Sequence, residues 1–271
     1  MVDPTSPDEP DPHSTLEDRR PESLDGEPAD VFGTVEVRED YVSRVGEAPE
    51  QQEGEGLRET DERSVYAALT ARRPEIEARV ADVDRPRFLI GRGSVDLALD
   101  DPFVSPWHAQ LYRSDGSLLL EDMDSENGVY LRLADDLELE DGDEIAMGRQ
   151  RFVFRTTWDT EAEAEVETVE LGAPARGRTA RLERRIEGGG TAGIHPIGDS
   201  ITIGREGTIL EYPRDALLAD SHAVIVRDGD SYFLNDLDTD TGTFIRIHNP
   251  LEVVDGDCFL VGRTRIDVAF K

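Results

Sequence analysis

Short apolar runs alternate with polar turn residues along most of the chain after about residue 60. Runs such as FLIG, AQLY, LLLED, GVYLRL, EIAMG and RFVF are separated by Gly, Asp, Ser and Pro, as expected for short strands between turns. Apolar and polar residues alternate in QRFVFR and RTRIDVAF, which indicates strands with one buried face. Many short strands at this spacing predict an all-β fold of two antiparallel sheets packed as a sandwich.

The whole pattern occurs twice. RFLIGRGS is followed later by SITIGREG, and LEDGDEIAMGRQRFVF by VVDGDCFLVGRTRIDV. His222 follows His108 by 114 residues, and the same interval separates Gly128 from Gly242. A constant interval across separate blocks indicates a duplicated domain, and it is too long for the unit of a solenoid.

The start of each repeat is less clear from its pattern. The segment SVYAALTARRPEIEARV could form a helix by composition. Its counterpart in the second repeat, TARLERRIEGGG, ends in glycines and suits a hairpin. We therefore favour strands at both places.

Composition divides the chain into four parts. The first 60 residues are rich in Asp, Glu, Pro and Gly and lack a periodic apolar pattern, which predicts disorder. The segment TEAEAEVETVELGAPARGR is expected to be an acidic linker. The predicted parts are a disordered acidic tail (1–60), a first β-sandwich domain (62–157), an acidic linker (158–178) and a second β-sandwich domain (179–271).

The charge of the chain is strongly negative. It has 61 Asp and Glu against 29 Lys and Arg, for a formal net charge of −32, and Lys271 is its one lysine. Such a composition is typical of a halophile, whose proteins work in a salt-filled cytoplasm; an ordinary acidic protein is the alternative. Without a basic stripe, no nucleic-acid partner is expected.

The sequence also bears on membrane association, secretion and disulfide bonds. No apolar run is long enough for a membrane span, and the acidic, proline-rich start MVDPTSPDEPDP does not resemble a signal peptide. The lone Cys258 cannot form an intrachain disulfide. We expect a soluble, cytoplasmic protein with no membrane partner and no cofactor.

Two acidic loops, DMDSENG (122–128) and DLDTDTG (236–242), invite a comparison with calcium loops. An EF-hand loop has glycine at position 6 and glutamate at position 12. Here glycine falls at position 7 in both loops, and position 12 is Leu133 or Ile247. We therefore predict no metal site. The loops are interpreted as turns between strands, with Gly128 and Gly242 supplying a positive φ.

The ordered motifs of the first repeat resemble the forkhead-associated (FHA) domain. They are Gly91-Arg92, Ser105-Pro-Trp-His108, Ser125-Glu-Asn127-Gly128, Asp141-Gly-Asp143 and Gly148-Arg149. The resemblance covers most of residues 65–156. It implies a sandwich of two sheets whose loops at one end bind phosphothreonine peptides, without catalytic activity.

The resemblance also implies roles for individual residues. Arg92 and Ser105 would bind the phosphate, and Asn127 would hold the peptide main chain. This is reasonable chemistry, because a guanidinium gives a phosphate dianion charge-assisted hydrogen bonds and an asparagine amide can pair with an extended backbone. Further binding candidates are Ser125, Glu126 and Arg205, and the structural positions are His108, Gly128, His222 and Gly242.

The second repeat departs from the motif more than the first. It keeps Gly204-Arg205 but has Ala219 at the serine position and Thr241 at the asparagine position. We expect it not to read phosphothreonine. In the first repeat, Glu126 stands where the family often has threonine, and its carboxylate would repel a phosphate unless it points away.

The favoured function is a phosphothreonine-binding signalling adaptor that binds through the first domain. A phosphate-independent structural or assembly module is the alternative, and no arrangement typical of an enzyme is found. The chain's own tail is a further candidate ligand, because Thr5 and Thr15 are each followed three residues later by an acid, Asp8 and Asp18. Trp107 could contact the peptide or pack within the sandwich.

Overall fold

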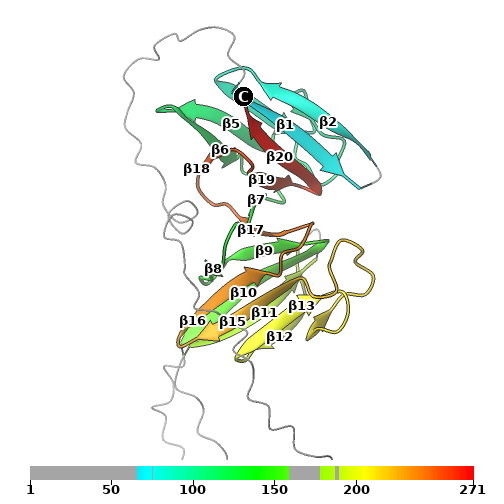
Figure 1. Ribbon diagram of the computed structural model, residues 1–271, viewed down its shortest axis with the longest axis vertical. Coiled ribbons are helices and arrows are strands. Elements are labelled where there is room, and N and C mark those ends of the chain that lie inside the picture. Colours follow the sequence, from blue (N-terminus) through cyan, green and yellow to red (C-terminus); the bar gives the residue numbers. More distant parts are fainter. Residues whose placement is uncertain (1–65, 75, 159–177, 187–188) are drawn as a thin grey trace, which may run out of the picture. The chain divides into compact units, whose positions relative to one another are not determined.

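The computed structural model describes residues 66–74, 76–158, 178–186 and 189–271. The predicted acidic tail, and all of the predicted linker except its two end residues, lie outside this range. The described residues form strands, turns and loops, so the predicted all-β class is confirmed (Figure 1). No helix capable of crossing a membrane is found among them.

Each repeat contributes ten strands. The first provides β1 (Ala67–Arg73), β2 (Ile76–Val83), β3 (Arg87–Gly91), β4 (Leu97–Ala98), β5 (Ala109–Ser114), β6 (Ser117–Asp122), β7 (Val129–Arg132), β8 (Leu137–Glu138), β9 (Glu144–Met147) and β10 (Gln150–Trp158). The second provides β11 (Arg178–Arg185), β12 (Thr191–Ile197), β13 (Ser200–Gly204), β14 (Leu210–Glu211), β15 (Ala223–Asp228), β16 (Ser231–Asp236), β17 (Thr243–Arg246), β18 (Leu251–Val253), β19 (Cys258–Val261) and β20 (Thr264–Phe270).

The ambiguous segments at the start of each repeat are strands. β1 pairs antiparallel with β2, and β11 with β12. Buried and more exposed residues alternate along β1, as they do along β20, which pairs with it. This alternation gives each strand one face for the core.

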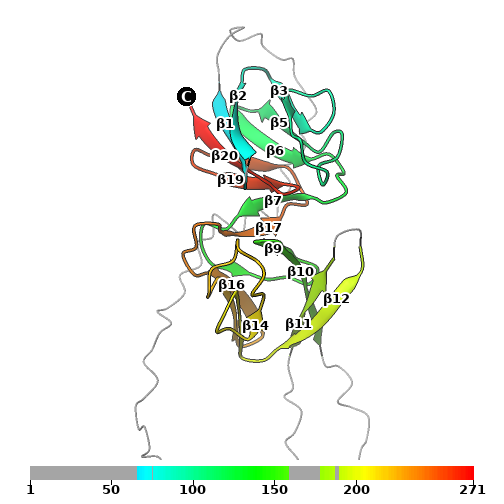
Figure 2. The same ribbon diagram turned by 90° about the vertical axis from the view of Figure 1, so that its right-hand side faces the viewer.

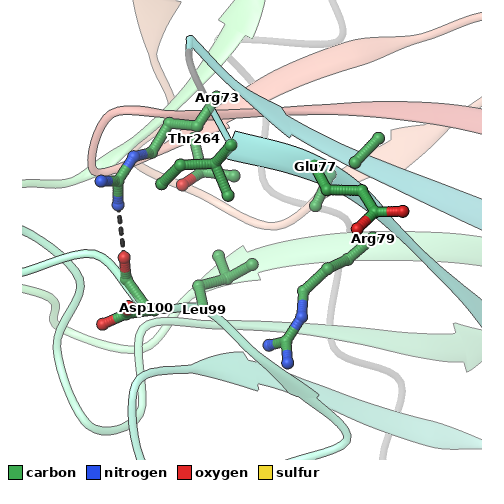
Figure 3. A pocket seen from close by; sticks show the side chains of 9 residues that line it. Arg73, Glu77, Arg79, Leu99, Asp100 and Thr264 are labelled. Carbon is green, nitrogen blue, oxygen red and sulfur yellow. Dashed lines mark hydrogen bonds between the residues drawn. The ribbon is translucent and has the colours of Figure 1, made fainter.

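The strands form three sheets. One sheet has ten strands in the order β12-β11-β10-β9-β17-β7-β19-β20-β1-β2. The two others have five strands each, in the orders β18-β6-β5-β3-β4 and β14-β13-β15-β16-β8. The part of the ten-stranded sheet that holds β1, β19 and β20 lies against the layer of β3, β5 and β6 (Figure 2). We call this sandwich one, and the sandwich built around β10, β11, β15 and β16 sandwich two.

The last three strands of each repeat are exchanged. β18, β19 and β20 of repeat two pair with β6, β7 and β1 of repeat one. In return, β8, β9 and β10 of repeat one pair with β16, β17 and β11 of repeat two. Sandwich one is therefore built from both ends of the described chain, and sandwich two from the stretch 137–246 between them. The pairing does not follow the predicted domain boundaries of 62–157 and 179–271.

Two short segments mark where the exchange occurs. The chain passes from one sandwich to the other at 133–136 (LADD) and at 247–250 (IHNP). In each case the strand before the segment lies in the ten-stranded sheet and the strand after it lies in a five-stranded sheet, so the segment connects two sheets. Because the two repeats share one apolar pattern, the last strands of either repeat can complete either sandwich.

The exchange has an internal pseudo-two-fold symmetry. β7 pairs antiparallel with β17, and Leu131 lies opposite Ile245, its counterpart 114 residues later. The flanking pairs, Tyr130 with Arg246 and Arg132 with Phe244, are also related by this interval. Leu131 and Ile245 are almost fully buried, so the symmetry point lies in the core of the molecule.

Candidate functional site

Three loops meet at one end of sandwich one. They follow β3, precede β5 and connect β6 to β7. Backbone hydrogen bonds join the first two, since Arg92 N–H donates to the Ser105 carbonyl at 3.0 Å and Gly93 N–H to the Pro106 carbonyl at 3.1 Å. A Cβ atom at Gly91 would lie 2.3 Å from the Pro106 oxygen, so this approach requires glycine.

His108 fastens the second loop to the third. The Ser105 N–H donates to His108 Nδ1 at 3.0 Å, and His108 Nε2 lies 2.9 Å from the Gly128 carbonyl oxygen. Nδ1 must therefore accept and Nε2 must donate, which is the neutral ring with its proton on Nε2. Burial lowers the pKa of His108 and favours this form, although the Gly128 carbonyl opposes the shift. The predicted structural role of His108 agrees with this geometry.

Arg92 and Ser105 are the groups available to a ligand. Arg92 is exposed, and its guanidinium has no hydrogen bond or ion pair with any residue that the structure describes. The Ser105 hydroxyl is half-buried and accepts the Glu126 N–H at 3.2 Å, so its own proton remains free to donate. An unengaged guanidinium and a free hydroxyl donor, on residues whose backbones are hydrogen-bonded to each other, are suited to an anion such as phosphate.

The three binding candidates on the third loop differ in exposure and in hydrogen bonding. Asn127 Nδ2 donates to the Phe103 carbonyl at 2.9 Å, and its second amide proton and its oxygen remain for a ligand. Glu126 is exposed. Ser125 is buried and its hydroxyl accepts the Gly128 N–H at 3.0 Å. Ser125 therefore builds the turn, and its predicted role in binding does not fit this placement.

The acidic loops are turns held by their own carboxylates. Asp122 Oδ1 accepts the Ser125 N–H at 3.0 Å, and Asp236 Oδ1 accepts the Thr239 N–H at 2.8 Å. The predicted positive φ of both glycines is confirmed, at 76° for Gly128 and 79° for Gly242. The carboxylates thus support the loops from within.

Repeat two reproduces this scaffold closely. The Ala219 N–H donates to His222 Nδ1 at 3.2 Å, and His222 Nε2 lies 3.1 Å from the Gly242 carbonyl oxygen. The Thr241 hydroxyl donates to the Leu217 carbonyl at 2.8 Å, in place of the bond between Asn127 and Phe103. Threonine therefore keeps the tie between loops but has no amide left for a peptide.

The arginine of repeat two is already occupied. Arg205 Nη2 and Nε donate to Asp220 Oδ1 at 2.6 and 2.9 Å. Asp220 is the counterpart of Pro106 and lies beside Ala219, which lacks the hydroxyl of Ser105. A carboxylate of the chain itself thus takes the position that an anionic ligand would need. Arg205, a binding candidate from sequence, is not available in this arrangement.

Two features of the site were not predicted from sequence. Asp220 differs from Pro106 in a simple alignment of the repeats, and that difference was a usable signal. The buried carboxylates of Asp101 and Asp215, which hold strands of the opposite repeat, gave no signal because their partners depend on the exchange. The alternative that Trp107 packs inside the sandwich is excluded, because 63% of its surface is exposed.

Comparisons with known proteins agree with this architecture. The FHA-domain family model matches residues 88–148 and again residues 201–262. The chain therefore carries a tandem pair of FHA domains. Each match ends in a turn of the exchanged segment, after β9 in one repeat and after β19 in the other, so each FHA sequence is completed in space by strands from the other.

One curated relative and two solved structures are similar to parts of the chain. An oxoglutarate dehydrogenase inhibitor from Corynebacterium diphtheriae is 38% identical over 89 residues, which are 32% of this chain and 62% of that protein. The FhaA FHA domain in complex with the intracellular domain of Rv3910 is 28% identical, covering 31% of this chain and 94% of that one, with a TM-score of 0.22. Mycobacterium tuberculosis EmbR with a low-affinity phosphopeptide is 26% identical, covering 34% and 24%, with a TM-score of 0.23.

Proposed function

We propose that this protein is a phosphothreonine-binding adaptor without enzymatic activity, and that it binds through the loops of repeat one. The observation that carries the proposal is the difference between two equivalent arginines. Arg92 is exposed and has no side-chain partner among the described residues, whereas Arg205 is held by Asp220. The FHA-domain match at residues 88–148 supports the same assignment.

Each group has a role in the proposed complex. Arg92 donates charge-assisted hydrogen bonds to the phosphate, and Ser105 adds a neutral donor. Asn127 pairs with the peptide main chain, using the amide atoms that are not bound to Phe103. Trp107 is exposed between Ser105 and His108, where a peptide side chain can pack against its ring.

High salt is not expected to abolish such binding. At about 1 M salt the Debye length is roughly 3 Å, so only direct contacts to the phosphate contribute. At low salt the net charge of −32 repels an acidic ligand. The proposed site therefore binds in rising KCl, and affinity that collapses below about 1 M KCl would contradict direct recognition of this kind.

The test is a phosphothreonine peptide library applied to the whole chain at high KCl, followed by calorimetry with a selected peptide. Arg92→Ala is expected to weaken binding by about 10- to 100-fold, since hydrogen bonds to charged groups contribute roughly 1.5–3 kcal/mol. Arg205→Ala is the matched control and should leave the affinity unchanged. Binding that ignores the phosphate, or equal effects of the two variants, would instead favour a phosphate-independent assembly module.

Two ligands can be tested first. The relative's name makes an oxoglutarate dehydrogenase the first protein partner to examine. The chain's own tail is the second, through phosphorylated Thr5 or Thr15, both of which lie outside the described residues. Mass spectrometry of the native protein that finds no phosphate on either threonine would remove the tail from consideration.

A further inference from the structure

The loops of the repeat-one site are attached to strands that belong to repeat two. Asp101 is fully buried directly ahead of the Ser105 loop. Its Oδ2 accepts the Arg263 N–H at 2.9 Å and the Thr264 hydroxyl at 3.1 Å. Arg263 and Thr264 form the turn and the first residue of the exchanged hairpin β19–β20. A buried carboxylate with several donors is a strong attachment, because each lost partner leaves charge unsatisfied.

The attachment continues to the peptide-binding amide by direct contacts. Asp101 Oδ1 accepts the Phe103 N–H at 3.0 Å, and the Phe103 carbonyl accepts Asn127 Nδ2 at 2.9 Å. The Arg263 guanidinium also lies 3.8 Å from the centre of the Phe103 ring, which is close enough for a cation–π interaction. Thr264, Asp101, Phe103 and Asn127 thus form one continuous path.

Repeat two has the same attachment without a competent site. Asp215 Oδ2 accepts the Arg149 N–H at 2.7 Å and Gln150 Nε2 at 2.8 Å, and its Oδ1 accepts the Leu217 N–H at 3.1 Å. Leu217 occupies the position of Phe103, so no aromatic ring is present for Arg149 to face. The chain therefore contains its own control for the attachment.

We propose that the β19–β20 hairpin of repeat two is a positioning element of the repeat-one peptide site and acts through Asp101 and Phe103 on Asn127. This inference rests on the proposed function of the site. It gives repeat two a role that requires no phosphate binding of its own. The hairpin completes the sandwich and fixes the orientation of the amide that meets the peptide, which is how supporting contacts preorganise a binding site.

A matched pair of variants in the whole chain tests the proposal. Thr264→Val removes a hydroxyl donor from Asp101, and Gln150→Leu removes an amide donor from Asp215. Thr264→Val should weaken phosphopeptide binding by roughly three- to thirty-fold, the range of couplings carried through packed networks. Gln150→Leu should change it less than about two-fold, because the comparable loss of a hydrogen bond falls on the repeat without a site.

A second readout does not depend on any ligand. The Asn127 side-chain amide should shift in the NMR spectrum and exchange its protons faster in Thr264→Val, and both properties should stay as in the unmodified protein in Gln150→Leu. An unchanged Asn127 amide in Thr264→Val would overturn the proposal, even if phosphopeptide binding is weakened. If the unmodified protein binds no phosphopeptide, the proposed function fails, and the amide still decides whether the hairpin positions Asn127.

A second pair of variants tests the proposal if Thr264→Val or Gln150→Leu does not fold. Arg263→Gln and Arg149→Gln change exposed residues at equivalent turns, so both should fold. Only the first removes a contact with an aromatic ring, and only the first should move the Asn127 amide. Equal effects of the two on that signal would contradict the proposal.

The exchange itself has a direct test. A protease recognition sequence is inserted between β10 and β11 of the whole protein, and cleavage is confirmed on a denaturing gel. Exchanged strands hold the two halves together, so they should elute as one species under native conditions and separate only in denaturant. Halves that part under native conditions would show unexchanged repeats and would overturn the proposal.

Discussion

The loop ends of the two repeats share a scaffold and differ in what they offer a ligand. His108 and His222 make the same two contacts in each. Arg92 has no partner in the part of the chain that the structure describes, whereas Arg205 is bound by Asp220. The comparison separates residues that build such a site from residues that use it. Repeat two retains the first kind and has replaced the second.

The most demanding test of this comparison is to restore the second site. Ala219→Ser, Asp220→Pro and Thr241→Asn together give repeat two the ligand-facing groups of repeat one. Calorimetry should then show two phosphopeptides bound per chain in place of one, because the scaffold is already present. The pair Ala219→Ser and Thr241→Asn without Asp220→Pro is the control, and it should stay at one, since Arg205 remains occupied. A triple variant that gains no site would show that the scaffolds differ in more than these residues.

The converse change should close the first site. Pro106→Asp places a carboxylate where Asp220 stands, and Arg92 should turn to it as Arg205 does. The expected loss of phosphopeptide affinity is about 10- to 100-fold, since the ligand must displace a charge-assisted pair. In Pro106→Asn the new side chain has nearly the shape of aspartate but no charge, so this variant should lose far less phosphopeptide affinity. Similar losses in both variants would mean that proline itself shapes the loop.

The histidines are the point at which both repeats should behave alike. Burial is the main cause that lowers the pKa of both His108 and His222 below the usual 6.5. The unfolded chain therefore binds protons first as the pH falls, so the histidine contribution to stability is complete above about pH 6.5 and is lost as the pH falls toward the folded pKa values. Denaturant unfolding between pH 7 and pH 5 should show this decline.

Replacing each histidine by glutamine separates its effect on folding stability from its effect on phosphopeptide binding. His108→Gln and His222→Gln should each flatten the pH dependence to a similar degree. Only His108→Gln should also reduce phosphopeptide affinity, because the Ser105 loop loses its support. A pH profile unchanged by either substitution would contradict the assigned role.

The smallest effect is expected at Glu126, which is exposed at the edge of the site. Glu126→Thr removes a negative charge and adds a hydroxyl, and it should tighten phosphopeptide binding by about two- to five-fold at low salt. The gain from charge should shrink near 1 M KCl, where screening is strong. Glu126→Gln distinguishes the two contributions, because it removes the charge alone. A gain that persists at high salt only for threonine would assign the benefit to its hydroxyl.

Local structure was readable from sequence because local rules decide it. Alternation predicted the strands, and the turn interpretation of the acidic loops predicted positive φ at Gly128 and Gly242. Arg92, Ser105 and Asn127 lie on meeting loops as their motif suggests, and their role in binding stays a prediction. The strand exchange could not be predicted from the sequence. β10 and β20 have the same alternation of apolar and polar residues, and this pattern fits either sandwich equally well.

The role of the Ser125 hydroxyl could not be decided from the sequence motif. Its hydroxyl could face a ligand or support its own turn, and the pattern Ser-x-Asn-Gly is compatible with both. The structure buries it against Gly128. Arg205 matches Arg92 as a residue. The change from proline to Asp220 was visible in the sequence, and the structure shows that this carboxylate binds the Arg205 guanidinium.

The pairing of Leu131 with Ile245 at the pseudo-two-fold point has a consequence for how such a molecule can change. Two identical chains that exchanged strands about the same point would carry every substitution in both of their sites. Here both repeats lie in one chain. The strand exchange is therefore intramolecular, and the association of the exchanged strands does not weaken on dilution. A substitution such as aspartate at the proline position can therefore alter one site and leave the other intact.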